Sequence, residues 1–160
     1  MIGHIVHGPN SGEVDRGRLV IVGCCKSKTI TAVPVPALDL YLSGPVPTLR
    51  AHLGHQPDRR SRIRILSAEH GIVTADTPLL PYDRPLDPDR AAALRPVVAH
   101  AMRQEMDANG VPSEVLVVVE PLYLVLVADL LAVPGIRVRW VPDPVAGWPE
   151  AENILKEWKW

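Results

Sequence analysis

The chain of 160 residues has the length and composition of one globular domain, with 47% hydrophobic and 22% charged residues. Its 17 basic and 18 acidic residues give a formal net charge of −1, so no overall positive field favours a nucleic-acid backbone as partner. The two cysteines are adjacent and the longest apolar run is interrupted by charges and proline, so we expect no disulfide framework, signal segment or membrane span and a cytoplasmic location.

The predicted elements alternate between strands and helices after an N-terminal arm. Residues 1–17 show no hydrophobic periodicity, so we expect a flexible or peripheral arm, followed by a single α/β domain at 18–160. Short continuous aliphatic runs indicate buried strands, and longer runs that begin at capping residues indicate helices. In chain order we expect a strand at 18–23, short helices at 37–41 and 46–53, a strand at 62–67, a helix at about 87–108, a strand at 114–119, a helix at about 120–131, a strand at 136–141 and a helix at 149–160.

This order predicts a three-layer α/β sandwich with a four-stranded, mostly parallel sheet and helices on both faces, as in Rossmann-like folds. Ligands of such sheets bind beyond the carboxyl ends of the strands. Residues 24–28 follow the first strand, 67–71 follow the second, and 81–83 lie in a long polar loop. We therefore expect these three segments to meet in one cleft.

Basic, hydroxyl and thiol groups follow the first predicted strand. Lys26, Ser27 and Lys28 suit a bound phosphate or carboxylate, and an exposed charged turn is the alternative interpretation. Cys25, beside two lysines and with His70 as a partner, is a candidate catalytic thiol, although free cysteines at strand ends usually serve packing.

Acid–base groups follow the second strand and recur in the polar loop. Glu69 and His70 precede a glycine in a bend where a carboxylate and an imidazole suit general acid–base catalysis, with a pair of surface residues as the alternative. We expect Tyr82 to stack on a planar ring, and Asp83 either to bind the edge of a base or to cap the next turn. Glu120 either faces the same cleft or caps the following helix.

Taken together, these motifs resemble a bacterial and phage domain family of unknown function, family 6884. The family is marked by Cys-x-Lys-x-Lys, Asp-Leu-Tyr-x-Ser with a downstream Arg, Leu-Ser-Ala-x-His-Gly-Leu, Pro-Tyr-Asp and a late Gly-containing loop. Between about 19 and 158 the matching residues are Cys24, Lys26, Lys28, Asp39, Leu40, Tyr41, Ser43, Arg50, Leu66, Ser67, Ala68, His70, Gly71, Pro81, Tyr82, Asp83, Tyr123 and Gly147.

The order of motifs is also similar, more weakly, to a domain attached to archaeal tRNA-guanine transglycosylases and archaeosine synthases. That domain has a fold like uracil-DNA glycosylase. The resemblance implies a four-stranded parallel sheet and an ancestral connection with nucleobases, and it implies no particular reaction.

The function expected from these residues and the resemblance is an enzyme for nucleosides or nucleotides, most simply one that hydrolyses an N-glycosidic bond or transfers the base. We expect a small-molecule substrate rather than a nucleic acid, which the charge does not favour, and no cofactor or metal. The expected catalytic residues are Glu69, His70 and Asp83. The expected substrate-binding residues are Cys24, Lys26, Ser27, Lys28, Tyr41, Arg50, Ser67, Tyr82, Glu120 and Tyr123.

Two other classes of function remain open at this point. A non-catalytic module that binds tRNA or DNA beside a partner enzyme would use the local cluster Arg59, Arg60, Arg62 and Arg64, although a solvated turn is the favoured reading of that cluster. A cysteine-dependent enzyme would use Cys25. Three late tryptophans, Trp148, Trp158 and Trp160, are expected to cover an edge of the core, with a homodimer contact as the alternative.

Overall fold

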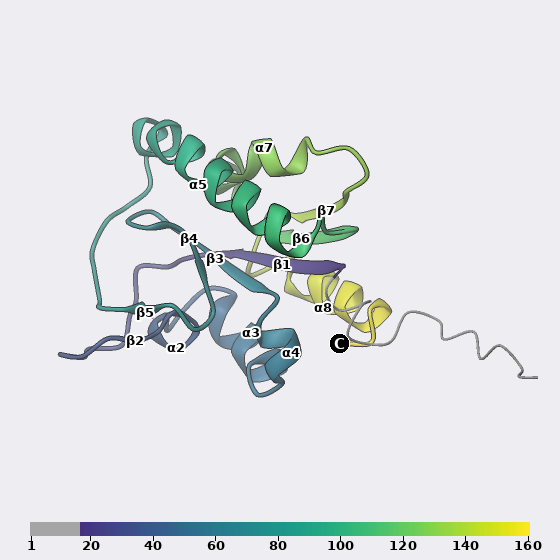
Figure 1. Ribbon diagram of the computed structural model, residues 1–160. Helices are drawn as coiled ribbons and strands as arrows, with labels where there is room; N and C mark the ends of the chain where they lie inside the picture. Colours follow the sequence, from purple (N-terminus) through teal and green to yellow (C-terminus); the bar gives the residue numbers. More distant parts are fainter. Residues whose placement is uncertain (1–16) are drawn as a thin grey trace, which may run out of the picture.

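Five strands form the central sheet of the computed structural model, which describes residues 17–160 (Figure 1). Across the sheet they run in the order β4 (Gly71–Thr74), β3 (Ile63–Ser67), β1 (Arg18–Gly23), β6 (Glu114–Val118) and β7 (Arg137–Val141). β1 is parallel to β3 and β6, and β6 is parallel to β7. The four predicted strands are confirmed, whereas the predicted arm at 1–17 lies outside the described residues except for its last residue.

The fifth strand, β4, corrects the expected count of four. β4 runs antiparallel to β3, with Ser67 opposite Gly71 in the register, so the two strands form a tight hairpin at one edge of the sheet. Gly71 has a φ of 86°, a left-handed conformation that glycine adopts without steric cost. A second correction is the pair β2 (Val35–Pro36) and β5 (Pro78–Leu79), a small separate antiparallel sheet in segments for which no strand was predicted.

Helices cover both faces of the sheet, as expected for three layers (Figure 1). One face carries α5 (Pro88–Asn109), α6 (Pro121–Leu124), the 3₁₀ turn η1 (Val125–Val127) and α7 (Ala128–Leu131), and the other carries α2 (Ala37–Leu40), α3 (Val46–Leu53), α4 (Pro57–Arg60) and α8 (Trp148–Glu157). Within residues 17–160, no helix combines the length and the hydropathy needed to cross a bilayer.

The aliphatic run of β1 explains how the two layers of helices are held against the sheet. Leu19 and Ile21 pack in the hydrophobic cluster that includes α5 and α7, whereas Val20 and Val22 pack in the cluster that includes α3 and α8. Successive side chains of a strand point to opposite faces, so a strand buried on both faces has to be apolar at every position. Trp158 and Trp160 belong to the second cluster and are 4% and 7% exposed, which confirms that they cover the core.

The long helix α5 is capped by Asp87, whose Oδ1 accepts a hydrogen bond of 2.7 Å from the backbone N–H of Arg90. We expect Asp87→Ala to lower the free energy of unfolding by about 1 kcal/mol, because an unsatisfied N–H is left at the helix start. Urea denaturation measures the loss. Asp87→Asn is the matched control, because asparagine caps as well as aspartate does, and an equal loss in both variants would show that capping is not the cause.

Candidate functional site

A cavity of about 470 Å³ opens beyond the carboxyl ends of the neighbouring strands β1 and β6. The loop after β1, the start of α6 and the segment before α5 supply its walls. It is lined by Cys24, Cys25, Lys26, Lys28, Asp83, Arg84, Pro85, Leu86, Glu120 and Tyr123. Two of the three predicted segments, 24–28 and 81–83, therefore reach one cavity, and Glu120 faces it rather than capping α6 with its side chain.

Backbone pairing fixes the loop that carries the two lysines. The N–H of Leu42 donates to the carbonyl of Ser27, and the N–H of Thr29 donates to the carbonyl of Leu40. Arg50 holds the other side of this pairing, because its Nη1 donates to the carbonyl oxygens of Leu38 at 2.8 Å and Tyr41 at 3.2 Å. Ser27 and Arg50, both expected to bind substrate, thus shape the loop and do not line the cavity.

The two lysines differ in how they are held. Lys28 Nζ donates to the carbonyl oxygens of Cys25 and Lys26, at 3.0 and 3.1 Å, and lies 4.4 Å from the ring centroid of Tyr82. The side chain of the exposed Lys26 makes no hydrogen bond or ion pair with any residue in the described part of the chain. Lys28 therefore ties the loop together, and Lys26 keeps its whole ammonium group for a ligand.

A chain of hydroxyl groups lies beside the cavity. Tyr82 Oη is 2.5 Å from Tyr41 Oη and 2.6 Å from Ser67 Oγ. Ser67 Oγ also accepts the backbone N–H groups of Glu69 and His70, at 3.2 and 3.0 Å. Both lone pairs of Ser67 are therefore occupied, so its hydroxyl donates to Tyr82, which in turn donates to Tyr41.

Glu69 and His70 lie outside the cavity lining, although both were expected to be catalytic. The ring of His70 is edge-on to Tyr82 with centroids 5.2 Å apart, and Glu69 Oε2 pairs with Arg84 Nη1 at 3.3 Å. Arg90 of α5 fastens this turn by donating to the carbonyl oxygens of Ala68 and Glu69, each at 2.8 Å. Glu69 therefore reaches the cavity only through Arg84, which does line it.

Both cysteines are free thiols that line the cavity. Cys24 Sγ is 3.1 Å from Tyr123 Oη, and Cys25 Sγ donates to the carbonyl of Ser27 at 3.2 Å. Among residues 17–160, no hydrogen bond joins Cys25 to His70, the partner expected for a catalytic thiol.

The three tyrosines of the chain all belong to this region, and their phenol groups resist ionisation. Burial raises the pKa of Tyr41 to about 12. Burial, followed by the electrostatic effect of the neighbouring Cys24, raises the pKa of Tyr82 and of Tyr123 well above the usual value. The folded protein therefore favours neutral phenols at this site.

We expect the free energy of unfolding to fall as pH rises from 10 to 12. Below pH 10 the phenol of Tyr41 is protonated in both states, whereas between pH 10 and 12 only the unfolded chain ionises, which costs the fold about 2–3 kcal/mol for this residue alone. Urea denaturation at pH 8, 10 and 11 measures the loss, and absorbance near 295 nm follows the phenols. A titration near pH 10 in the folded protein would contradict the expectation.

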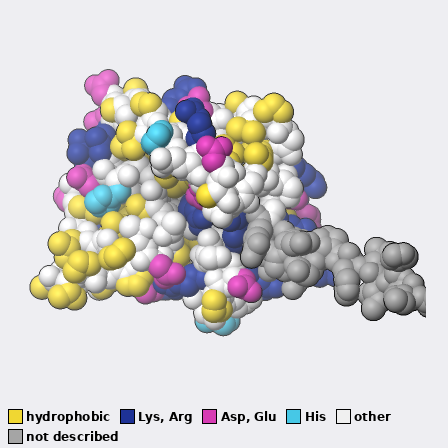
Figure 2. Space-filling view, viewed as in Figure 1, with side chains coloured by type: hydrophobic (Ala, Val, Ile, Leu, Met, Phe, Trp, Pro, Cys, Tyr) yellow, Lys and Arg dark blue, Asp and Glu magenta, His cyan; other side chains and the backbone are white. Residues whose placement is uncertain are grey.

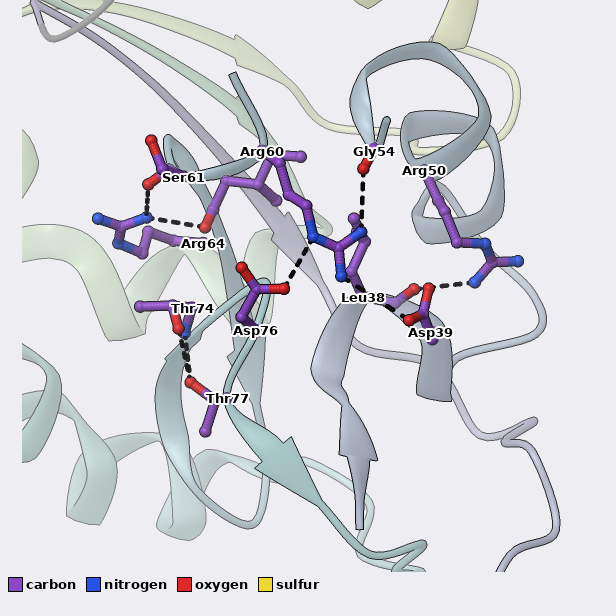
Figure 3. A network of polar contacts seen from close by, with 11 residues as sticks. Leu38, Asp39, Arg50, Gly54, Arg60, Ser61, Arg64, Thr74, Asp76 and Thr77 are labelled. Carbon is purple, nitrogen blue, oxygen red and sulfur yellow. Dashed lines mark hydrogen bonds and ion pairs between the residues drawn. The ribbon is translucent and has the colours of Figure 1, made fainter. Parts of the chain in front are cut away.

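The surface and the arginine cluster bear on the nucleic-acid alternative. Figure 2 shows acidic and basic side chains interspersed on one face, where hydrophobic side chains gather over the segment between β1 and β2. In Figure 3, Arg60 lies between Asp76, 2.8 Å from its Nε, and the carbonyl of Gly54, 3.1 Å from its Nη1. Arg64 is buried and pairs with Glu105.

The other two arginines of the cluster also serve internal contacts. Arg62 Nε donates to the carbonyl of Arg18 at 2.9 Å, and Arg59 Nη2 donates to the carbonyl of Lys159 at 2.8 Å. All four guanidinium groups therefore bind other parts of the fold, whereas the sequence favoured a solvated turn for this cluster.

A second cavity, of about 200 Å³, adjoins the first. The two share Cys24, Cys25, Glu120 and Tyr123 as a common wall. The remaining lining of the second cavity comes from Gly23, Gly44, Pro45, Val119, Asp143, Pro144 and Val145. Residues after β7 thus take part in the site, in addition to the loops that follow β1 and β6.

Comparisons with known proteins bear on identity. Neither the curated proteins nor the solved structures contain a match to this chain. A model of a family of unknown function, DUF6884, matches residues 19–139, a segment that holds all the residues lining the larger cavity. Because this match covers more than half of the sequence, the chain belongs to the DUF6884 family of unknown function.

Proposed function

We propose that the protein is a hydrolase that cleaves the N-glycosidic bond of a nucleoside 5′-monophosphate. The observation that carries the proposal is the lining of the larger cavity, which combines the cations of Lys26, Lys28 and Arg84 with the carboxylates of Asp83 and Glu120. Its volume of about 470 Å³ falls within the range of small-molecule sites. Cations suit a phosphate group, and a carboxylate suits the positive charge that develops on the sugar.

In the proposed reaction the bond between the sugar C1′ and the base nitrogen breaks, and the electron pair leaves with the base. Asp83 stabilises the oxocarbenium-like transition state and orients the water that attacks C1′. The proton that Asp83 takes from this water finally resides on the released base. The products are a free base and ribose 5-phosphate.

Glu69 and His70 take supporting roles in this proposal. Glu69 forms an ion pair with Arg84, which lines the cavity, and His70 packs against Tyr82. Tyr82 is a poor stacking surface for a base, because the ammonium group of Lys28 lies over its ring. We assign stacking instead to Tyr123, which lines both cavities.

Incubation of the purified protein with the 5′-monophosphates of adenosine, guanosine, cytidine and uridine tests the proposed function. Chromatography separates the free base from the nucleotide. We expect base release from at least one of the four, and slower release from the matching nucleoside, because it lacks the phosphate that the cations bind. No release from any nucleotide at high enzyme concentration would contradict the proposal.

A thiol-dependent reaction is the second candidate, because both cysteines line both cavities. The two candidates differ in the expected effect of Cys25→Ser. N-glycosidic hydrolysis should fall by less than tenfold, since the hydroxyl replaces the hydrogen bond to Ser27, whereas loss of the nucleophile would abolish a thiol-dependent reaction. A loss of base release greater than a hundredfold would favour the thiol mechanism.

The proposal also includes a cytoplasmic location and a distant similarity to uracil-DNA glycosylase-like domains. Two free thiols at a ligand cavity suit a reducing compartment, which supports the expectation of a cytoplasmic enzyme. A mostly parallel sheet with a cavity beyond the carboxyl ends of its strands is compatible with the similarity to uracil-DNA glycosylase-like domains. We do not propose the tRNA- or DNA-binding module, because its four arginines bind within the fold.

A further inference from the structure

The second cavity differs in character from the first. Apart from the shared wall, its lining contains Pro45, Val119, Pro144 and Val145, whereas the first cavity contains the three cations. Its volume is about 200 Å³, less than half that of the first cavity. A flat ring system fits such a space, and apolar walls favour a ligand group that carries little charge.

Tyr123 provides an aromatic surface for such a ring. Its side chain lines both cavities, and its hydroxyl is held 3.1 Å from Cys24 Sγ. Gly23 lies against the same ring, since a Cβ atom at this position would be 3.7 Å from two of the ring carbons. The ring is thus supported by the end of β1, which keeps its orientation fixed for stacking.

Glu120 provides an acceptor without an internal partner. In the described part of the chain its carboxylate makes no hydrogen bond or ion pair, and it does not cap α6. Asp143, the other acid of the second cavity, already accepts the backbone N–H groups of Val145 and Ala146, at 3.0 and 2.9 Å. Glu120 is therefore the carboxylate that remains for N–H donors of a ligand.

We propose that the second cavity is the base subsite of the nucleotide site, where a planar nitrogen heterocycle stacks on Tyr123 and donates its N–H groups to Glu120. This inference rests on the proposed function, because the first cavity then takes the ribose and the phosphate. Binding of ribose 5-phosphate should depend on the first cavity only, whereas binding of a nucleotide should depend on both.

Filling the second cavity tests the inference. Val145 is 76% exposed, so Val145→Trp adds bulk at the cavity without disturbing the core. The matched control is Val111→Trp, because Val111 is 53% exposed and precedes β6, whereas the cavity lies beyond the carboxyl end of that strand. Titration calorimetry with ribose 5-phosphate and with the four 5′-monophosphates is done in the Asp83→Asn background, which is expected to slow turnover during the titration.

We expect the tightest nucleotide to bind at least tenfold more tightly than ribose 5-phosphate. Val145→Trp should weaken this nucleotide at least tenfold and change ribose 5-phosphate less than twofold, and Val111→Trp should change neither. Glu120→Gln should weaken the nucleotide more than ribose 5-phosphate, which provides a second readout if Val145→Trp folds poorly.

The outcomes separate the two proposals. If ribose 5-phosphate binds and is weakened by Lys26→Ala, but Val145→Trp and Glu120→Gln leave the nucleotide unaffected, the base subsite is overturned and the nucleotide site stands. If neither ribose 5-phosphate nor any nucleotide binds, the proposed function itself fails.

Discussion

Tyr82→Phe is expected to lower the free energy of unfolding by about 2–4 kcal/mol, as measured by urea denaturation at pH 7. The variant removes the oxygen that links Ser67 to Tyr41. Ser67 and Tyr41 are each fully buried, and each hydroxyl group forms a hydrogen bond with Tyr82 Oη. A buried polar group that loses a hydrogen bond costs about 1–3 kcal/mol, and the variant takes one hydrogen bond from each of the two hydroxyl groups.

A double-mutant cycle with Ser67→Ala shows whether the loss comes from the hydroxyl chain. Each single variant breaks the bond between Ser67 and Tyr82, so the double variant should cost about 1–2 kcal/mol less than the sum of the two. Additive losses would mean that the two hydroxyl groups act independently. In that case the loss in Tyr82→Phe would have to come from packing of its ring.

The central strands were predictable because a strand that is buried on both faces has a continuous run of aliphatic residues in the sequence. Residues 19–22 of β1 and 115–118 of β6 are aliphatic at every position, and the structure buries all of them. The hairpin strand β4 has no such aliphatic run, because it has only four residues and is exposed at one end. Its pairing depends on the turn at 68–70 and on the neighbouring strand. The residues of β4 alone therefore do not predict this pairing.

The same contrast explains which site residues were predictable. Residues that directly follow parallel strands, such as Lys26 after β1 and Glu120 after β6, line the cavity as the strand-end rule requires. The rule does not hold for Glu69 and His70, because β3 turns straight back into β4 and their backbone N–H groups are bound by Ser67. Arg84 was missed because the path from β5 to α5 is set by tertiary contacts.

Asp83→Asn is expected to slow base release by about 10²–10³-fold, because an amide neither stabilises the positive charge on the sugar nor accepts a proton from water. Asp83 is exposed and makes no hydrogen bond or ion pair with the described residues, so the free energy of unfolding should stay within about 0.5 kcal/mol of the parent value. Rates of base release under saturating nucleotide measure the first effect, and urea denaturation measures the second.

Glu69→Gln is the matched control, since it also changes a carboxylate to an amide and keeps an oxygen for the contact with Arg84. Because Glu69 acts through Arg84 and does not line the cavity, we expect its variant to raise KM and to lower kcat by less than tenfold. If Glu69→Gln instead lost as much kcat as Asp83→Asn, the turn after β3 would have to contribute to the chemistry directly. The carboxylate that orients water would then lie on the hairpin, outside the cavity that the lysines line.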